Sequence, residues 1–268
     1  MAASIAAAEP RLALGDGESL TYRVGWGLLT GAGEIKIAAA AVPPSAADAT
    51  ARLQVTTTTA TKGFTHAFYT FEARAEALFD VKTGRLVSGT ETSKAPKKET
   101  KTSIEFDYAK SVATYANLLN PAKNLTLPLP PGDPLDLIMS LVQTRTWDLK
   151  PGEKRDALVL FDDEFYELTL HAIGYEDVKT PLGKFKTLVL EPRMEKTPAK
   201  GMFKRGSTAR VWISQDEKKL PVKFQVEFKF GAGVATLVAH TPPISPASPS
   251  LPTTTREKTG SDAPNPRP

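Results

Sequence analysis

The sequence contains no cysteine among its 268 residues. This absence excludes disulfide bonds, thiolate catalysis and metal or iron–sulfur sites that are built on cysteine ligands. The chain also lacks any apolar run that approaches the roughly 18 to 20 residues of a membrane-spanning helix. We therefore expect a chain without covalent cross-links that is not transmembrane.

Charge of one sign is nowhere concentrated in the sequence. Lysine and arginine number 34 against 30 aspartates and glutamates, which gives a formal net charge of +4 and a pI near 9.1. Nucleic-acid-binding proteins normally carry a basic stripe, whereas the lysines here form short, scattered clusters. We therefore expect no nucleic-acid partner.

Motifs for catalysis and for cofactor binding are missing too. The nucleophile pattern G-x-S-x-G does not occur, and His66, His171 and His240 belong to no H-x-H or H-x-x-x-H arrangement. The glycines between Gly25 and Gly33 join one predicted strand to the next, so they do not form a phosphate-binding loop before a helix. The sequence predicts no catalytic residues, no metal and no cofactor. A hydrolase whose site is assembled only in the fold remains an alternative.

One acidic segment could suggest a cation site or an acid/base pair. A calcium loop needs oxygen ligands at alternating positions and a glycine for the bend, and the segment lacks both. We interpret it as a solvated hairpin turn, formed by Asp162, Asp163, Glu164 and Glu167.

Alternation of apolar and polar residues is what the sequence has in abundance, and it is clearest from Thr208 to His240. In the middle of this stretch the apolar side chains share one parity: Val222, Phe224, Val226, Phe228 and Phe230. A period of two is typical of a strand with one buried face and one wet face. The glycines at Gly231 and Gly233 then close a hairpin. The stretch predicts three strands of an antiparallel meander.

The first half of the chain repeats this pattern. We expect strands at 18–26, 34–40, 51–60 and 64–79. The lysines that follow are interpreted as a solvated loop around Pro96, with contact to an acidic ligand or a membrane surface as the alternative: Lys94, Lys97, Lys98 and Lys101.

The period changes after a proline-rich crossing. Asp133 and Pro134 suit the N-cap and the first position of a helix that runs to about Arg145. Its apolar residues then recur at spacings of three and four: Leu135, Leu137, Ile138, Leu141 and Val142. The predicted fold is mainly β, a strongly curved antiparallel meander sheet that forms an open or partial barrel, with one packed α-helix around residues 134–145.

Both ends of the chain look non-globular. Ala6 to Ala8 match the small-x-small pattern before a signal-peptidase site, so residues 1–14 are interpreted as a signal-peptide remnant that begins upstream of Met1, or as a disordered N-terminus. Residues 15–240 form a single predicted β domain. Residues 241–268 are rich in proline, serine and threonine and are predicted to be a disordered tail.

Several segments, taken in order, resemble a bacterial exported family of unknown function called DUF3108. The opening strand carries G-E-x-L-x-Y-x-V-x-W from Gly17 to Trp26, and D-P-L-D follows at residues 133–136. The match continues with G-K-F at residues 183–185 and with V-W-I-S at 211–214 and L-P-V at 220–222. It ends with the predicted strand from Gly233 to Leu237. The resemblance implies a curved envelope β protein. It implies no established activity and no catalytic residues.

These observations lead to a ligand-binding hypothesis. We expect a non-enzymatic protein of the periplasm or cell envelope whose concave sheet face binds a lipid, another amphiphile, a glycan or an extended polymer. The candidate ligand-binding residues are Tyr22, Trp26, Phe68, Trp212, Phe224 and Phe228. The same aromatic residues could instead fill the core. The alternative function is an envelope interaction module that acts through an edge strand or the proline-rich tail.

Overall fold

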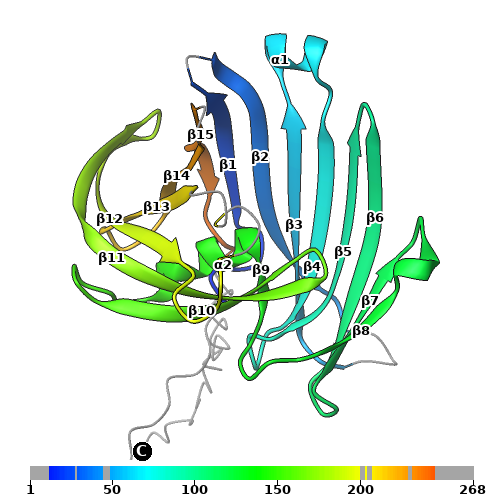
Figure 1. The fold of residues 1–268 in the computed structure, drawn as a ribbon. Coiled ribbons are helices and arrows are strands. Elements are labelled where there is room, and N and C mark those ends of the chain that lie inside the picture. Colours follow the sequence, from blue (N-terminus) through cyan, green and yellow to red (C-terminus); the bar gives the residue numbers. More distant parts are fainter. Residues whose placement is uncertain are drawn as a thin grey trace, which may run out of the picture.

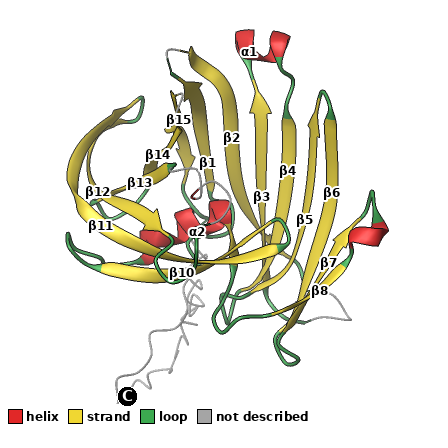
Figure 2. Cartoon of the chain, viewed as in Figure 1, coloured by secondary structure: helices red, strands yellow, loops and turns green. Residues whose placement is uncertain are grey.

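In the computed structural model the chain forms one large, strongly curved sheet with very little helix (Figures 1 and 2). The structure describes residues 12–27, 29–44, 49–199, 203, 207–228 and 231–244. Residues 1–11 of the predicted leader and 245–268 of the predicted tail lie outside the described residues. Within these limits the predicted class, a mainly β protein with a curved antiparallel sheet that does not close, is confirmed.

The sheet has 15 strands and consists of two meanders that meet in its middle. In the first meander, which we call the first wing, each strand pairs antiparallel with the next along the chain. Its strands are β1 (Ser19–Trp26), β2 (Leu29–Val42), β3 (Arg52–Thr61), β4 (Glu72–Asp80), β5 (Leu86–Ala95), β6 (Lys98–Asp107), β7 (Val112–Asn117) and β8 (Leu125–Pro128). A short 3₁₀-helix, Pro121–Lys123, precedes β8.

The second wing contains the predicted meander of residues 208–240, and that prediction is confirmed. Its strands are β9 (Leu135–Asp136), β10 (Lys154–Phe161), β11 (Glu164–Thr180), β12 (Gly183–Arg193), β13 (Thr208–Ser214), β14 (Pro221–Phe228) and β15 (Gly231–Thr241). The last strand, β15, pairs antiparallel with the first, β1, from Ser19 opposite Thr241 to Trp26 opposite Gly233. The two ends of the domain therefore lie side by side in the centre of the sheet.

The chain connection between the sheet's edges forces the sheet to curl. The edge strands are β8 and β9, and only residues 129–134 join them. Seven Cα steps span at most roughly 25 Å, so the edges of a sheet of 15 strands must come close together. No ladder among the described strands joins β8 to β9, and the barrel stays open.

The helix α2 (Leu137–Gln143) occupies the space between the wings (Figure 1). The predicted N-cap at Asp133 and first position at Pro134 are wrong. Residues 135 and 136 pair with β10 as a short parallel strand, and Asp136 caps the helix by accepting a hydrogen bond of 2.9 Å from Met139 N. Asp133 instead forms an ion pair with Arg85 at 2.7 Å. A 3₁₀ turn, Thr144–Thr146, extends the helix.

The predicted strand over residues 64–79 is wrong in its first half. A six-residue helix, α1 (Gly63–Phe68), stands at the tip of the β3–β4 hairpin, and β4 begins only at Glu72. The alternation of aromatic residues there looked like a strand, but Tyr69 N donates to Thr65 O at 2.8 Å and closes a helical turn. The second half is confirmed, since Ala77 and Phe79 are buried as expected.

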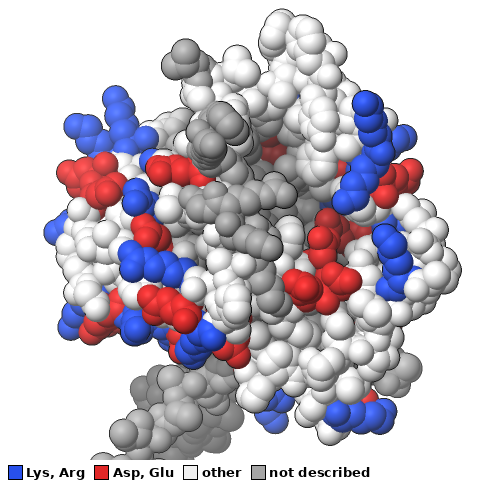
Figure 3. Space-filling view, in the orientation of Figure 1, with Lys and Arg blue, Asp and Glu red and all other residues white. Residues whose placement is uncertain are grey.

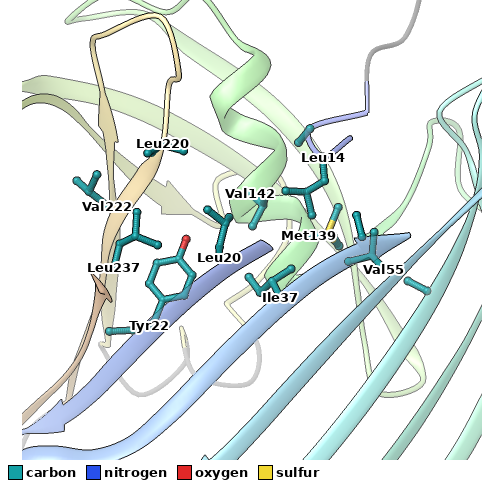
Figure 4. Close-up of a cluster of buried hydrophobic side chains, with 14 of the residues drawn as sticks. Leu14, Leu20, Tyr22, Ile37, Val55, Met139, Val142, Leu220, Val222 and Leu237 are labelled. Atoms are coloured by element: carbon teal, nitrogen blue, oxygen red, sulfur yellow. The ribbon is translucent and has the colours of Figure 1, made fainter. Parts of the chain in front are cut away.

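The core sits where the two wings and α2 meet. Met139 and Val142 of the helix pack against both wings (Figure 4). The side chains drawn around them in Figure 4 are fully buried or nearly so: Leu14, Leu20, Tyr22, Ile37, Val55, Leu220, Val222 and Leu237. Leu14 belongs to this cluster, so ordered packing begins before the predicted domain start at residue 15. The predicted packing of the helix against the sheet is thereby confirmed.

A buried ion pair fixes α2 to this junction. Arg145 Nη1 lies 2.6 Å from Glu18 Oε1, and the two side chains are only 12% and 3% exposed. Glu18 also receives a hydrogen bond from Gly15 N at 3.1 Å and lies 3.2 Å from His240 Nε2. The guanidinium donates further to the carbonyl oxygens of Ala13 and Lys218, so one cluster joins the helix end, β1, β15 and the β13–β14 turn.

Replacing Arg145 with methionine is expected to destabilise the protein by about 3–5 kcal/mol, because Glu18 would stay buried without its partner. The double variant Glu18→Gln, Arg145→Met should recover part of that loss. Urea unfolding followed by circular dichroism measures both. Equal stability of Arg145→Met and the wild type would show that the pair does not hold the junction together.

Candidate functional site

A cavity of about 300 Å³ lies on the concave face of the first wing. The strands β3 to β7 form one side of it, and the start of α2 and the β10–β11 turn form the other. We call this cavity the hollow. Its lining from the sheet includes Thr57, Thr59, Ala73, Ala75, Ala77, Gly89, Glu91, Thr102, Ile104 and Tyr115, and the opposite side contributes Asp136, Leu137, Ile138, Leu160, Phe161 and Asp162.

The hollow exists because side-chain size falls along each strand away from the helix. Near α2, large residues face one another across the ladder, as Leu53 and Phe79 do. Four and six residues further along β3 the pairs are smaller, with Thr57 opposite Ala75 and Thr59 opposite Ala73. Small side chains on a curved sheet do not reach across the interior, so space remains above the packed part of the core.

Side-chain contacts close the hollow where the sheet itself does not. Leu160 of β10 is buried against Ile104, Ala113 and Tyr115 of β6 and β7. Phe165 of β11 packs on the same cluster. The β10–β11 hairpin thus rests on the concave face of the first wing and serves as the far wall of the cavity without any ladder between the two.

The ionisable groups that line the hollow are all acidic. Glu76, Glu91, Asp136 and Asp162 border it, and no lysine or arginine does so among the described lining residues. By strand alternation Glu76 points to the outer face of the sheet, where it pairs with Arg74. The negative charge inside the hollow therefore comes from Glu91, Asp136 and Asp162. Figure 3 shows acidic side chains gathered between the two wings, at centre right.

The surroundings shift the pKa values of these groups. Burial, and then the charges of Asp162 and Asp136, raise the pKa of Glu91, although part of its side chain remains open to water. Burial also raises the pKa of Asp136, against the lowering effect of the backbone N–H groups that it caps. Burial together with Asp162 and Asp163 raises the pKa of Tyr115. The hollow therefore disfavours additional negative charge.

The structure does not bring the six predicted ligand residues together. Tyr22 and Phe224 are core residues whose rings lie 5.1 Å apart, and the Tyr22 hydroxyl donates to Pro221 O at 2.9 Å. Trp212 and Phe224 lie on opposite faces of the sheet. Phe224 of β14 pairs with Val211 of β13, while Trp212, the next residue of β13, pairs with Lys223. The Trp212 ring sits beneath the Lys223 ammonium, and its Nε1 donates to Glu176 at 2.8 Å.

The other three predicted residues lie towards the ends of the strands. The Trp26 ring rests on Gly233 of β15, where an added Cβ would come within 3.4 Å of it. Phe68 is 74% exposed on α1. The side chain of Phe228, like residue 230, lies outside the described residues. None of the six lines the hollow, and their role in binding stays a prediction.

Sequence reasoning missed the residues that do line the hollow, because they are small. Thr57, Thr59, Ala73 and Ala75 carry no chemical signal of their own. A signal was nevertheless present in the run of threonines and alanines on the inward parity of two adjacent strands. Only their register, which places them opposite one another, turns that composition into a cavity.

A second groove lies outside the wings, between the residue 129–134 link, α2 and β10. It measures about 510 Å³ and includes Trp147, whose ring is covered by the Arg155 guanidinium at 4.7 Å. The Lys196–Asp156 ion pair of 2.7 Å borders it as well. Two of its charged groups, Lys196 and Asp156, pair with each other and Arg155 covers Trp147, whereas the hollow has a mainly apolar lining, so we regard the hollow as the better candidate site.

The described residues provide no metal or histidine-based site in the hollow. No group of three histidine, aspartate or glutamate side chains there or elsewhere in the described chain could hold a metal ion. His171 pairs with Glu195 at 2.8 Å, His240 with Glu18, and His66 sits on α1. The acidic segment contains the predicted hairpin turn at Asp162 and Asp163, with Asp162 at a φ of 55°, but Glu164 and Glu167 belong to the ladder of β11 with β10.

The fold and the hollow define a class of protein: an open, barrel-like β-sheet with one helix plugging half of its concave side. The chain belongs to the family described as a protein of unknown function, DUF3108, whose sequence profile matches residues 21–238. No curated protein matches the chain. Among the described residues, no helix has the length and apolar character required to cross a membrane.

Solved structures that match the chain share little sequence with it. A β-barrel-like protein of the DUF1849 family from Brucella abortus matches at 6% identity and a TM-score of 0.53, covering 87% of this chain and 99% of its own. A "putative lipoprotein" from Parabacteroides distasonis matches at 9% identity over 87% of this chain and 100% of its own, with a TM-score of 0.32. A "putative exported protein" with a YmcC-like fold from Bacteroides fragilis matches at 10% identity over 85% of this chain and 97% of its own, with a TM-score of 0.33.

The raised pKa of Glu91 predicts an unusual pH dependence. Because the folded state binds this proton more tightly than the unfolded state, ionisation of Glu91 lowers stability as pH rises above its unfolded value of about 4.3. Glu91→Gln should therefore be more stable than the wild type near neutral pH, and the difference should vanish in acid. Thermal unfolding across pH measures this.

Asp107 provides a control of opposite sign. Hydrogen bonds from Lys110 lower the pKa of Asp107, so its ionisation stabilises the fold and Asp107→Asn should cost stability near neutral pH. If both variants responded to pH with the same sign, the hollow would not be the cause of the Glu91 effect.

Proposed function

We propose that this protein is a non-enzymatic binding protein that holds an amphiphilic molecule in the hollow of the first wing. The observation that carries the proposal is the unfilled cavity of about 300 Å³ on the concave face, bounded mainly by methyl and aliphatic groups. Ligand sites are typically concave and largely apolar, with a few polar groups that orient the ligand. The hollow has this composition.

The charges in the hollow favour one kind of amphiphile. Glu91 and Asp162 face a cavity that has no lysine or arginine among its described lining residues. An anionic head group would meet like charge in a partly desolvated space, whereas an ammonium or a hydroxyl-rich head group would find hydrogen-bond acceptors. The proposed ligand thus has an apolar chain against Thr57, Ala75 and Ile104 and a cationic or hydrogen-bond-donating head near Glu91.

The alternatives find less support. The edge strands are short, with four residues in β8 and two in β9, and the only longer open edge among the described strands is the part of β10 before residue 159, which β9 does not cover. The hydrolase alternative has carboxylates in the hollow, but Asp136 is occupied as a helix cap and no histidine lines the cavity among the described residues. An interaction through the tail concerns residues outside the described part of the chain.

The proposal includes a place in the periplasm or cell envelope. The small-x-small pattern at Ala6 to Ala8 and the resemblance to an exported family support it. An amphiphile carrier has an obvious use beside a membrane, where its ligand has low solubility in water.

Filling the hollow should abolish binding. Thr57→Trp places a large ring in the cavity, and we expect it to weaken binding of the fluorescent apolar probe N-phenyl-1-naphthylamine by about tenfold or more. Thr56→Trp is the matched control, because Thr56 lies on the outer face of the same strand. Probe binding by the two variants is compared by fluorescence titration, after thermal unfolding has shown that their stabilities are equal. Equal binding by both variants, or no binding by the wild type, would refute the proposal.

The head-group preference can be tested with a pair of competitors of equal chain length. Dodecylamine should displace the probe more effectively than dodecanoate, and Glu91→Gln should narrow the difference. A stronger effect of dodecanoate in the wild type would contradict the assigned head-group class while leaving the cavity itself in place.

A further inference from the structure

Three hairpin tips of the first wing end at the same rim of the sheet (Figure 1). Successive antiparallel turns alternate between the two ends of a sheet, so the β1–β2, β3–β4 and β5–β6 turns share one end. The β3–β4 tip carries α1, and the β5–β6 tip is the two-residue turn between Ala95 and Lys98. Lys62 N donates to Ala32 O at 3.0 Å, which joins the base of α1 to β2.

This rim presents large apolar side chains to solvent. No residue of α1 is buried, and Phe64 and Phe68 are 72% and 74% exposed, with their rings 4.5 Å apart. Tyr69 and Leu29 beside them are 51% and 53% exposed. Contiguous exposed apolar groups of this kind indicate a contact surface, because leaving them in water costs free energy that nothing in the fold offsets.

The local backbone holds these rings outward. Phe71 N donates to the Thr61 hydroxyl at 2.9 Å and Thr61 N donates to Phe71 O at 2.9 Å, which closes the base of the hairpin. The Thr70 hydroxyl donates to His66 O at 3.2 Å and braces the end of α1. The tip is therefore a built protrusion that carries its aromatic side chains on the outside.

Lysines lie next to this aromatic protrusion. The predicted lysine loop is a hairpin instead, in which Lys94 lies one residue before the end of β5, Lys97 lies in the turn and Lys98 begins β6. None of Lys94, Lys97, Lys98 and Lys101 forms an ion pair within 4.0 Å in the described part of the chain, although the charge of Lys98 is near enough to Glu91 to lower its pKa. Figure 3 shows basic side chains at the upper right, beside the uncharged surface of the tips. Strand β4 lies beside β5, with Glu72 opposite Lys94, so both tips belong to one surface.

We propose that this aromatic–lysine rim, formed by Leu29, Phe64, Phe68, Tyr69 and the four lysines, docks the protein onto the surface of a lipid bilayer that contains anionic lipids. Aromatic side chains favour the depth of the head groups, and lysines are attracted to anionic lipids at the surface. Side chains that project from narrow tips suit insertion between head groups.

The rim borders the hollow. Thr59 and Ala73, which line the cavity, lie two residues from Thr61 and Phe71 at the base of α1. A protein docked by this rim would hold the hollow beside the membrane, which fits the proposed amphiphile binding, but the docking itself does not depend on any ligand.

Vesicle co-sedimentation of the purified full chain tests the rim. The wild type should bind vesicles of phosphatidylethanolamine and phosphatidylglycerol, should bind phosphatidylcholine vesicles far less, and should be released by high salt. Two double variants should each reduce partitioning of the protein onto these vesicles by about tenfold. One is Phe64→Ser with Phe68→Ser, and the other is Lys97→Glu with Lys98→Glu. The hollow-filling Thr57→Trp should bind vesicles like the wild type, which separates this result from the ligand test.

Matched control variants make the same kinds of substitution, apolar to serine and lysine to glutamate, at positions outside the rim. Val81→Ser, Leu182→Ser deletes two half-exposed apolar side chains at the β4–β5 and β11–β12 hairpins, and Lys82→Glu, Lys184→Glu makes the same charge change at those two hairpins, outside the rim. Both should bind vesicles like the wild type. No binding by the wild type, rim variants that bind normally, or controls that lose binding equally would overturn the proposal. Concentration-dependent self-association that the Phe64, Phe68 variant abolishes would assign the rim to a second copy of the chain instead.

Discussion

The buried pair of Glu18 and Arg145 is the contact on which the arrangement of the two wings depends. Its carboxylate stands at the start of the first strand and beside the last, and its guanidinium comes from the turn after α2. A desolvated ion pair is costly unless all of its hydrogen bonds are made. Here the guanidinium also satisfies two carbonyl oxygens, so it fixes the helix in one position and orientation between the wings.

The position of the helix decides which half of the concave side is filled. Phe224, Leu141 and the inward residues of β12 and β13 form one packed cluster, so the second wing is a scaffold. On the first wing α2 reaches only the rows that contain Leu53, Val55 and Phe79. Beyond them the inward residues are threonine and alanine, and space remains. The concave face is thus packed in the second wing and partly open in the first wing.

Much of the fold could be predicted from local patterns, because alternation with a period of two identifies a strand whatever its partners. The helix start could not, since Asp133-Pro134 satisfies the local capping rules while Leu135 and Asp136 are taken up by a ladder with β10. The pairing of β1 with β15 and the hollow are also nonlocal. Both depend on register between segments that are far apart in sequence or on the size of residues that have no chemical signal, such as Thr57 and Ala75.

The open barrel follows from the same connectivity. Residues 129–134 bring β8 and β9 within reach, but Asp133 is held by Arg85, whose guanidinium also covers the Tyr108 ring at 4.7 Å. This anchor keeps the link at the helix end of the first wing, and the β10–β11 hairpin meets β6 and β7 only through Leu160 and Phe165. Side-chain contacts can separate at lower cost than a continuous ladder, because no row of backbone hydrogen bonds must break. The wall of the hollow is therefore its most easily opened side.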